Sequence, residues 1–305
     1  MAEPRRYRNL IMDSQRWEGF QFRDDDIVIS TASKCGTTWM QMQCALLLFQ
    51  DPVLPAPLTR LSPWVDIQTE TRESVMWVLE AQTHRRFIKT HTPLDGIPWD
   101  DRVTYITVGR DPRDVALSWD NHMGNLNIEK VLNQRIEVAG ADDLEELLTP
   151  EMLAPPEDPI VRFWTWIENG SIDDPDISGL PSLINHLQTF WVKRDLPNVA
   201  LFRYEDMKAD LDASMRRLAS LLGVEVDEAK WPTLVEAATF DKMRDRASDL
   251  APQVTHEFWQ DDARFFHVGG SGQWRAFFDD AAQERYDKRL DEIADRDLVA
   301  WLNGA

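Results

Sequence analysis

The sequence has little cysteine and lacks a long apolar run. Only two of its 305 residues are cysteines, Cys35 and Cys44, and their closeness along the chain argues against a structural disulfide. The longest uninterrupted apolar stretch, residues 45–49, is far shorter than the roughly 20 residues that cross a bilayer. These absences predict a reduced protein without a membrane-spanning segment.

Positive charge is also scarce. The 33 lysines and arginines stand against 53 aspartates and glutamates, which gives a net charge of -20. Such a surface repels nucleic acid and anionic lipid, so we expect no nucleic-acid partner, although a few focused cations can still hold a small anion. The basic N-terminus is followed by polar residues instead of the apolar segment of a signal peptide, which predicts a cytoplasmic location.

Short β-branched and apolar runs alternate with helical patterns along the chain. The runs predict strands, and apolar residues at helical spacing predict helices between them. The alternation is typical of a three-layer, P-loop-like α/β fold with a central parallel sheet flanked by helices, here as one domain over residues 1–305. The predicted strands are 27–30, 86–89, 103–108 and 199–202, and the predicted helices are 38–49, 72–83, 114–122, 183–194 and 210–222.

Three other segments carry weaker patterns. Residues 125–176 hold a helical piece at 161–168 but no strand pattern, so we expect an insertion or lid on the substrate side. The tail at 279–302 is predicted to be helical, with Gly304 past its end, and the three aspartates at 24–26 are predicted to form a solvated turn.

The first predicted strand leads into a loop of small and hydroxylated residues, TASKCGTTW at 31–39, which precedes a helix. Successive backbone N–H groups and the positive end of a helix can hold phosphate oxygens, and Thr37, Thr38 and Lys34 add donors. An ordinary strand-to-helix turn is the alternative. We favour a phosphate-binding loop.

Spacing separates this loop from two related kinds. A nucleoside-triphosphatase loop has its lysine directly after the second glycine, whereas Lys34 precedes Gly36. A cysteine phosphatase would carry an arginine six residues after Cys35, where this chain has Gln41. Cys35 is therefore predicted to be a loop residue and not a nucleophile.

Polar side chains follow the other predicted strands at the same edge of the sheet. His91 follows the second strand, where a histidine can accept a proton from a hydroxyl group. Arg110 follows the third strand and can bind a phosphate through two N–H groups, and Ser118 lies two helical turns further. Tyr204 follows the fourth, and the stretch HVGGSGQW at 267–274 can close over a ligand or form a surface loop.

In this order, the motifs resemble those of the cytosolic-type sulfotransferases that use 3′-phosphoadenosine 5′-phosphosulfate (PAPS) as the sulfuryl donor. Residues 33–39 resemble the 5′-phosphosulfate loop of that family, 110–118 its 3′-phosphate motif and 266–274 its C-terminal glycine-rich motif. The stretches FIKTHTPLDG at 87–96 and VGRDPRD at 108–114 most resemble mycobacterial glycolipid sulfotransferases.

The resemblance implies a role for each residue. His91 would be the general base for a hydroxyl acceptor, a phenol, an alcohol or a glycolipid. Lys34 would stabilise the oxygen that bridges sulfate and phosphate, and Lys89 would bind the sulfuryl oxygens, so no metal is expected. PAPS, and the product 3′,5′-adenosine bisphosphate (PAP), would contact Ser33, Lys34, Cys35, Gly36, Thr37, Thr38, Trp39, Arg110, Ser118, Tyr204, Thr239, Phe240, His267 and Gly269.

The chain departs from the family pattern at three places. His267 and Val268 replace an arginine and a lysine, which predicts weaker or pH-dependent cofactor binding, and Cys35 replaces a common serine. The family's dimer motif is not recognisable at 275–280, so the oligomeric state stays open.

Two other functions and the acceptor stay open at this stage. A nucleotide-binding or lipid-carrying module without efficient catalysis is one alternative. A P-loop kinase is a weaker one, because the Gly-Lys-Ser/Thr sequence is missing. The acceptor is not identified, but six tryptophans suggest an apolar cleft or simply a core: Trp64, Trp77, Trp99, Trp119, Trp164 and Trp166.

Overall fold

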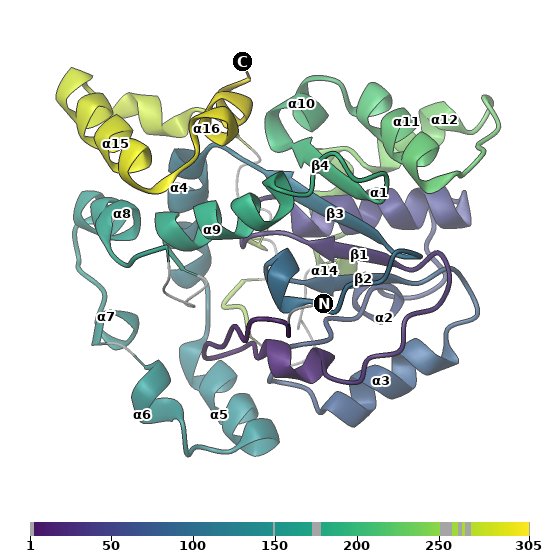
Figure 1. Ribbon diagram of the computed structural model, residues 1–305, viewed down its shortest axis with the longest axis horizontal. Coiled ribbons are helices and arrows are strands. Elements are labelled where there is room, and N and C mark those ends of the chain that lie inside the picture. The colour runs from purple at the N-terminus through teal and green to yellow at the C-terminus, as the bar shows by residue number, and fades with distance from the viewer. Residues whose placement is uncertain are drawn as a thin grey trace.

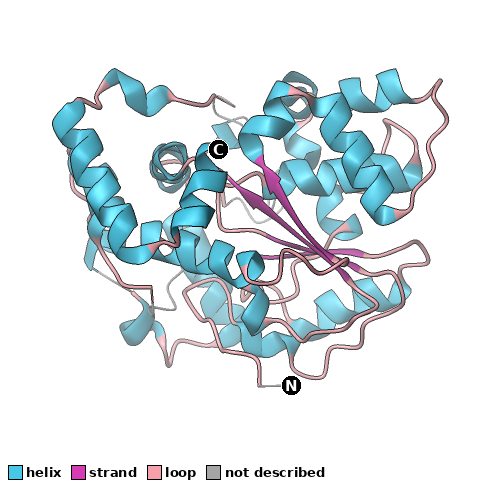
Figure 2. Cartoon of the chain, turned by 45° about the horizontal axis from the view of Figure 1, so that its top comes forward, coloured by secondary structure: helices cyan, strands magenta, loops and turns pink. Residues whose placement is uncertain are grey.

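A parallel four-stranded sheet lies at the centre of the computed structural model, which describes residues 3–148, 150–172, 178–250, 258–261, 264–265 and 270–304. Its strand order is β2-β1-β3-β4, and helices cover both faces (Figures 1 and 2). The strands are β1 Ile27–Ser30, β2 Phe87–Thr90, β3 Thr104–Gly109 and β4 Val199–Arg203. The three-layer α/β fold and all four predicted strands are confirmed.

Strand side chains alternate between two apolar layers, as period-two patterning requires. Ile27 and Ile29 of β1 pack in the layer that contains α1 (Thr37–Phe49) and α11 (Leu211–Leu222), whereas Val28 between them packs in the layer that contains α3 (Arg72–Ala81). The strands are buried on both faces, which explains their continuous apolar runs.

The strand register brings the carboxyl ends of the strands together. Ser30 of β1 pairs with Thr90 of β2, and Gly109 of β3 pairs with Arg203 of β4. The loops that follow all four strands therefore begin at one edge of the sheet, where a parallel α/β fold binds its ligands.

The five predicted helices are confirmed with small shifts at their ends. Asp111 caps the helix that follows β3 by accepting the Arg113 N–H, and Asp210 caps a later helix through the Ala213 N–H. The helix predicted at 183–194 begins earlier because Pro181 fits its first turn. Their bounds are α1 Thr37–Phe49, α3 Arg72–Ala81, α4 Pro112–Met123, α9 Leu180–Trp191 and α11 Leu211–Leu222.

The segment predicted as an insertion or lid contains more helix than expected. The predicted piece at 161–168 is confirmed within α8 Pro159–Glu168, but α5 Ile128–Ala139 was not predicted. Its apolar face is interrupted, because Arg135 is buried one turn after the buried Val131. The shorter helices here are α6 Leu144–Leu147 and α7 Pro150–Leu153.

Two expectations were wrong in part. The tail is two helices, α15 Asp280–Ile293 and α16 Arg296–Asn303, because the Asp295 side chain caps a new helix by accepting the Asp297 N–H. Gly304 lies past the end of α16 at φ 84° as expected. Asp26 is not solvated: it is buried and forms an ion pair with the buried Arg86.

The remaining short helices connect the main elements. No helix among the described residues is long and apolar enough to cross a membrane. The connecting helices are η1 Ser14–Trp17, α2 Leu58–Leu61, η2 Leu94–Gly96, α10 Tyr204–Ala209, α12 Trp231–Ala237, α13 Phe240–Asp245, α14 Ala247–Leu250 and η5 Gln273–Ala276.

Candidate active site

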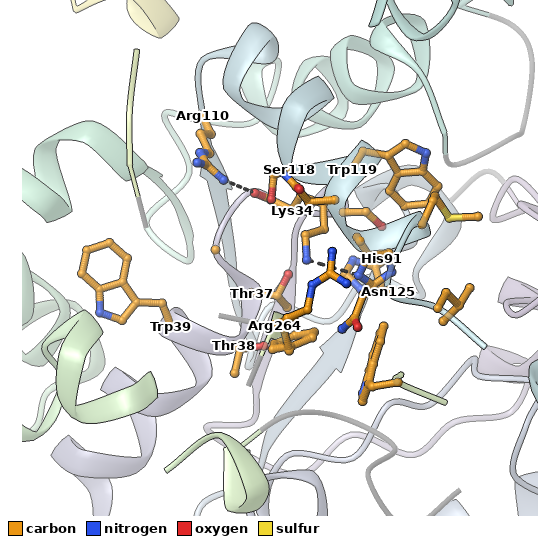
Figure 3. Close-up of a pocket in the computed structure, with 18 of the residues that line it drawn as sticks. Lys34, Thr37, Thr38, Trp39, His91, Arg110, Ser118, Trp119, Asn125 and Arg264 are labelled. Carbon is orange, nitrogen blue, oxygen red and sulfur yellow. Dashed lines mark hydrogen bonds between the residues drawn. The ribbon is translucent and has the colours of Figure 1, made fainter. Parts of the chain in front are cut away.

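A cavity of about 500 Å³ opens at the carboxyl edge of the sheet. It collects predicted site residues from all four strand ends, and Figure 3 labels those that follow β1, β2 and β3. Cys35 is not among its lining residues, and His267 and Gly269 lie outside the described residues. The predicted residues that line the cavity are Ser33, Lys34, Gly36, Thr37, Thr38, Trp39, Lys89, His91, Arg110, Ser118, Tyr204, Thr239 and Phe240.

The loop between β1 and α1 has the backbone of an anion-binding loop. Lys34 has φ 67° and Gly36 has φ 107°, both in the left-handed region. The positive φ favours glycine at position 36, and a Cβ there would also be crowded, 3.1 Å from Cδ2 of Tyr204. No side chain caps the start of α1. Its first N–H groups are therefore available to an anionic ligand.

His91 is held in one tautomer. Its Nδ1 lies 2.8 Å from the Thr31 carbonyl oxygen, which can only accept, so Nδ1 carries the proton and Nε2 keeps a lone pair. Burial, with the charge of Lys89 as a second cause, holds the pKa of His91 well below 6.5. The ring is therefore neutral at pH 7 and can accept a proton at Nε2.

Two desolvated lysines share the cavity with His91. The Nζ of Lys34 lies 3.3 Å from Nδ1 of His122, and burial lowers the pKa of Lys34 to about 7, helped by Arg110 and Lys89. The Nζ of Lys89 lies 4.1 Å from the ring centroid of Trp64, and burial lowers its pKa to about 8. An anion bound beside both ammonium groups would restore their charge.

Arg110 and Trp39 are oriented by contacts at the other end of the cavity. Arg110 donates to the carbonyl oxygens of Lys34 at 2.9 Å and Gly270 at 3.0 Å, while its buried Nε has no partner. The indole N–H of Trp39 donates to the Ala238 carbonyl oxygen at 2.8 Å. Figure 3 shows Trp39 and Arg110 on one side, His91 and Trp119 on the other, and Lys34 between them.

Cys35 is unsuited to be a nucleophile. Its thiol is fully buried, and burial raises its pKa to about 12. Cys35 and Cys44 are both free, as predicted. Among the described residues no group of three or more His, Cys, Asp or Glu side chains could hold a metal ion.

Several cavity residues were missed by the sequence analysis. His122 lies one helical turn after Ser118 on α4, and this i, i+4 spacing on a predicted helix was the available signal. Asn125, at the start of the 125–176 segment, forms two hydrogen bonds to the backbone of Asp261. Its Nδ2 donates to the Asp261 carbonyl oxygen at 2.9 Å, and its Oδ1 accepts the Asp261 N–H at 3.1 Å.

Much of the cavity lining is apolar, and part of it, Trp64, contacts His91. Of the six tryptophans proposed for an acceptor cleft, Trp64 and Trp119 line it. The core alternative holds for Trp99, Trp164 and Trp166, which pack against the hydrophobic core outside the cavity. Trp77 is 65% exposed and belongs to neither. The apolar wall contains Leu10, Ile11, Trp64, Ile67, Trp119, Met123, Leu126, Ile128, Val131, Met152, Phe258, Trp259 and Phe265.

Solved structures share this fold. A retinol dehydratase in complex with androsterone and the inactive cofactor PAP superposes with a TM-score of 0.68 at 21% identity, covering 92% of this chain and 85% of that chain. A mouse sulfotransferase complexed with PAP has a TM-score of 0.64 at 18% identity, covering 92% and 88%.

Sequence comparison is more specific. Residues 24–297 match the family model of the sulfotransferase domain. The chain is 44% identical to glycolipid sulfotransferases of Mycobacterium bovis and Mycobacterium tuberculosis, and each alignment covers 97% of this chain and 93% of the relative. The resemblance seen in the motifs is confirmed, and the chain is an enzyme that belongs to the sulfotransferase family.

Proposed function

We propose that this enzyme transfers a sulfuryl group from PAPS to a hydroxyl group of an apolar acceptor, with glycolipids as the first class to test. The observation that carries the proposal is the state of His91, a neutral ring with Nε2 unprotonated. It shares one cavity with two desolvated lysines and an anion-binding loop.

The residues present fit PAPS. When bound, PAPS supplies an activated sulfuryl group on a phosphate leaving group. The loop at 33–38 would hold the 5′-phosphosulfate, and the buried, unpartnered Nε of Arg110 suits a site for the 3′-phosphate together with Ser118. Trp39 and Phe240 would stack on the adenine, with Thr239 and Tyr204 beside them.

His91 and the lysines divide the chemistry between them. His91 Nε2 takes the proton of the acceptor hydroxyl as the acceptor oxygen bonds to sulfur. Lys89 stabilises charge on the sulfuryl oxygens. Lys34 stabilises charge on the phosphate oxygen as its bond to sulfur breaks, so in-line transfer requires no covalent enzyme intermediate.

The acceptor class is argued from the apolar wall. A long wall of aliphatic and aromatic side chains beside His91 suits an acyl or terpenoid chain better than a small polar alcohol. Relatives at 44% identity are glycolipid sulfotransferases by name. A lipid that presents a sugar hydroxyl to His91 satisfies both observations.

Two measurements test the proposal. PAP at saturation is expected to raise the melting temperature of the purified protein by several degrees, and radiolabelled sulfate from PAPS is expected to appear on a glycolipid in a panel with phenols and sterols. Absence of any thermal shift would contradict the donor. Equal transfer to small phenols and to lipids would contradict the acceptor class.

A further inference from the structure

A fully buried carboxylate lies beside the end of β2. Asp66 has no exposed surface and is not part of the cavity lining. Its segment runs alongside β2: the Lys89 N–H donates to the Pro63 carbonyl oxygen at 3.0 Å, and the Val65 N–H donates to the Lys89 carbonyl oxygen at 3.4 Å. Asp66 is therefore close to the catalytic groups without contacting the space where substrates bind.

Four donors converge on the Asp66 carboxylate. Oδ2 accepts from the Trp17 indole at 2.9 Å and from the hydroxyl groups of Thr90, at 2.5 Å, and Thr92. Oδ1 accepts from the Trp64 indole. Oδ1 faces only the Trp64 N–H and Oδ2 can accept from the other three donors, an arrangement that suits the carboxylate form. Burial nevertheless raises the pKa of Asp66 against the effect of these hydrogen bonds.

These donors flank or contact both predicted catalytic groups of this strand end, Lys89 and His91. Thr90 and Thr92 flank His91, and the Thr92 N–H also donates to Oγ1 of Thr90 at 2.9 Å. The Trp64 ring lies under the Lys89 ammonium and meets the His91 ring edge-on, with centroids 4.8 Å apart.

The charge of Asp66 acts on the same strand end. Among the described residues no salt bridge joins Asp66 to a cation, although its charge also raises the pKa of Arg16 against burial. Burying a carboxylate without an ion pair is costly, so its presence needs a reason beyond packing. Asp66 raises the pKa of Lys89 against burial. The charge of Lys89 lowers the pKa of three other titratable groups, Lys34, His91 and His122, all of which are cationic when protonated.

We propose that Asp66 is a positioning residue for sulfuryl transfer, which holds Trp64 and the two threonines around His91 and thereby fixes Lys89 and His91. The inference rests on the proposed function. It assigns to a residue outside the cavity the task of keeping the Nε2 of His91 and the ammonium group of Lys89 in place.

The sharpest variant is Asp66→Asn. An asparagine can direct its oxygen toward Trp17, Thr90 and Thr92, but its NH₂ group then faces the Trp64 N–H, so the indole is released and the charge is lost. Asp26→Asn is the matched control, because Asp26 is an equally buried carboxylate at the opposite end of the sheet, paired with Arg86.

We expect Asp66→Asn to bind PAP within about threefold of the wild-type Kd and to lower kcat by about ten- to a hundredfold. In a Lys34→Arg background, where Lys89 alone sets the alkaline limb of the kcat profile, Asp66→Asn is expected to move that limb down by roughly one pH unit, because Lys89 loses a neighbouring negative charge. Asp26→Asn is expected to lose stability without either change.

A readout without PAPS completes the test. The chain has six histidines, so ¹⁵N-histidine NMR can follow His91, assigned by its loss in His91→Gln. We expect one Nδ1–H tautomer in the wild type and mixed tautomers in Asp66→Asn. Should Asp66→Asn fail to fold, Trp64→Phe keeps the ring without its N–H and is expected to lower kcat without moving the pH limb.

The inference is overturned if Asp66→Asn matches Asp26→Asn in kcat, in the pH limb and in the His91 spectrum while the wild type transfers sulfate. In the fallback experiment, wild-type kcat in Trp64→Phe overturns it. A wild type that transfers sulfate to no acceptor contradicts the proposed function instead, so the two failures are distinguishable.

Discussion

The two active-site lysines predict an unusual pH dependence of transfer. Both must be protonated to stabilise negative charge, and in the free enzyme burial lowers the pKa of Lys34 to about 7 and that of Lys89 to about 8. The value of kcat/KM for PAPS reports the free enzyme, so we expect it to fall as the pH rises above about 7. The pKa of His91 lies well below 6.5, so protonation of this base is not expected to lower kcat/KM at pH 6.5.

Bound PAPS shifts this limb upward. Its anionic groups favour the ammonium forms of the two lysines and raise their pKa by about one to three units for a charge in contact. The pH above which kcat falls should therefore lie about one to three units higher than the pH above which kcat/KM falls. Arginine stays protonated at these pH values. In Lys34→Arg the fall of kcat/KM should therefore be set by Lys89 alone and begin near pH 8. Steady-state rates between pH 5.5 and 10 test both expectations.

The same shifts predict that the lysines destabilise the free protein. Between the folded pKa of Lys34, about 7, and its unfolded model value, 10.5, the unfolded chain binds more protons, so stability rises with pH in that window. Lys34→Met should therefore stabilise the ligand-free protein by about 1–3 kcal/mol at pH 6, discounted for partial exposure, and by less at pH 10. Calorimetry at both pH values measures this. A kcat/KM that is flat up to pH 10, or a Lys34→Met variant that is equally stabilised at both, would refute the reasoning.

Three further variants probe the nucleotide end. Gly36→Ala places a methyl group against Tyr204 at a positive φ, so calorimetric titration should show PAP affinity lowered at least about tenfold; an unchanged Kd argues against the anion-binding loop. Arg110→Lys loses the guanidinium fork and should weaken PAP about ten- to a hundredfold but ADP, which lacks the 3′-phosphate, much less; equal losses speak against a 3′-phosphate site. Cys35→Ser should keep kcat within about threefold, because the thiol is buried and protonated; abolished turnover would assign it a chemical role.

The site residues that follow the strands could be predicted, because their position depends only on the order and direction of the strands. A parallel sheet brings its carboxyl ends together, so Lys34, His91 and Arg110 were assigned to one edge from their place after three strands. The tautomer of His91 could not be predicted, because it depends on the Thr31 carbonyl oxygen of the neighbouring segment and hence on the strand register.

Residues whose roles depend on distant partners were missed. Asp26 was assigned to a solvated turn because its neighbours are acidic, and only the strand pairing brings Arg86 to it. Asp66 lies in a segment without helical or strand periodicity, and Trp17, one of its donors, is 49 residues away. Local pattern carries no information about such partners, since the tertiary fold alone decides which buried polar groups meet.

The central claim is that His91 is the general base of a PAPS-dependent transfer, and one paired measurement tests it most directly. Wild type and His91→Gln are compared for PAP affinity and for single-turnover transfer from PAPS to a glycolipid. We predict the same Kd within about threefold and a transfer rate about 10²- to 10⁴-fold lower in the variant. Transfer at the wild-type rate by His91→Gln would contradict the account.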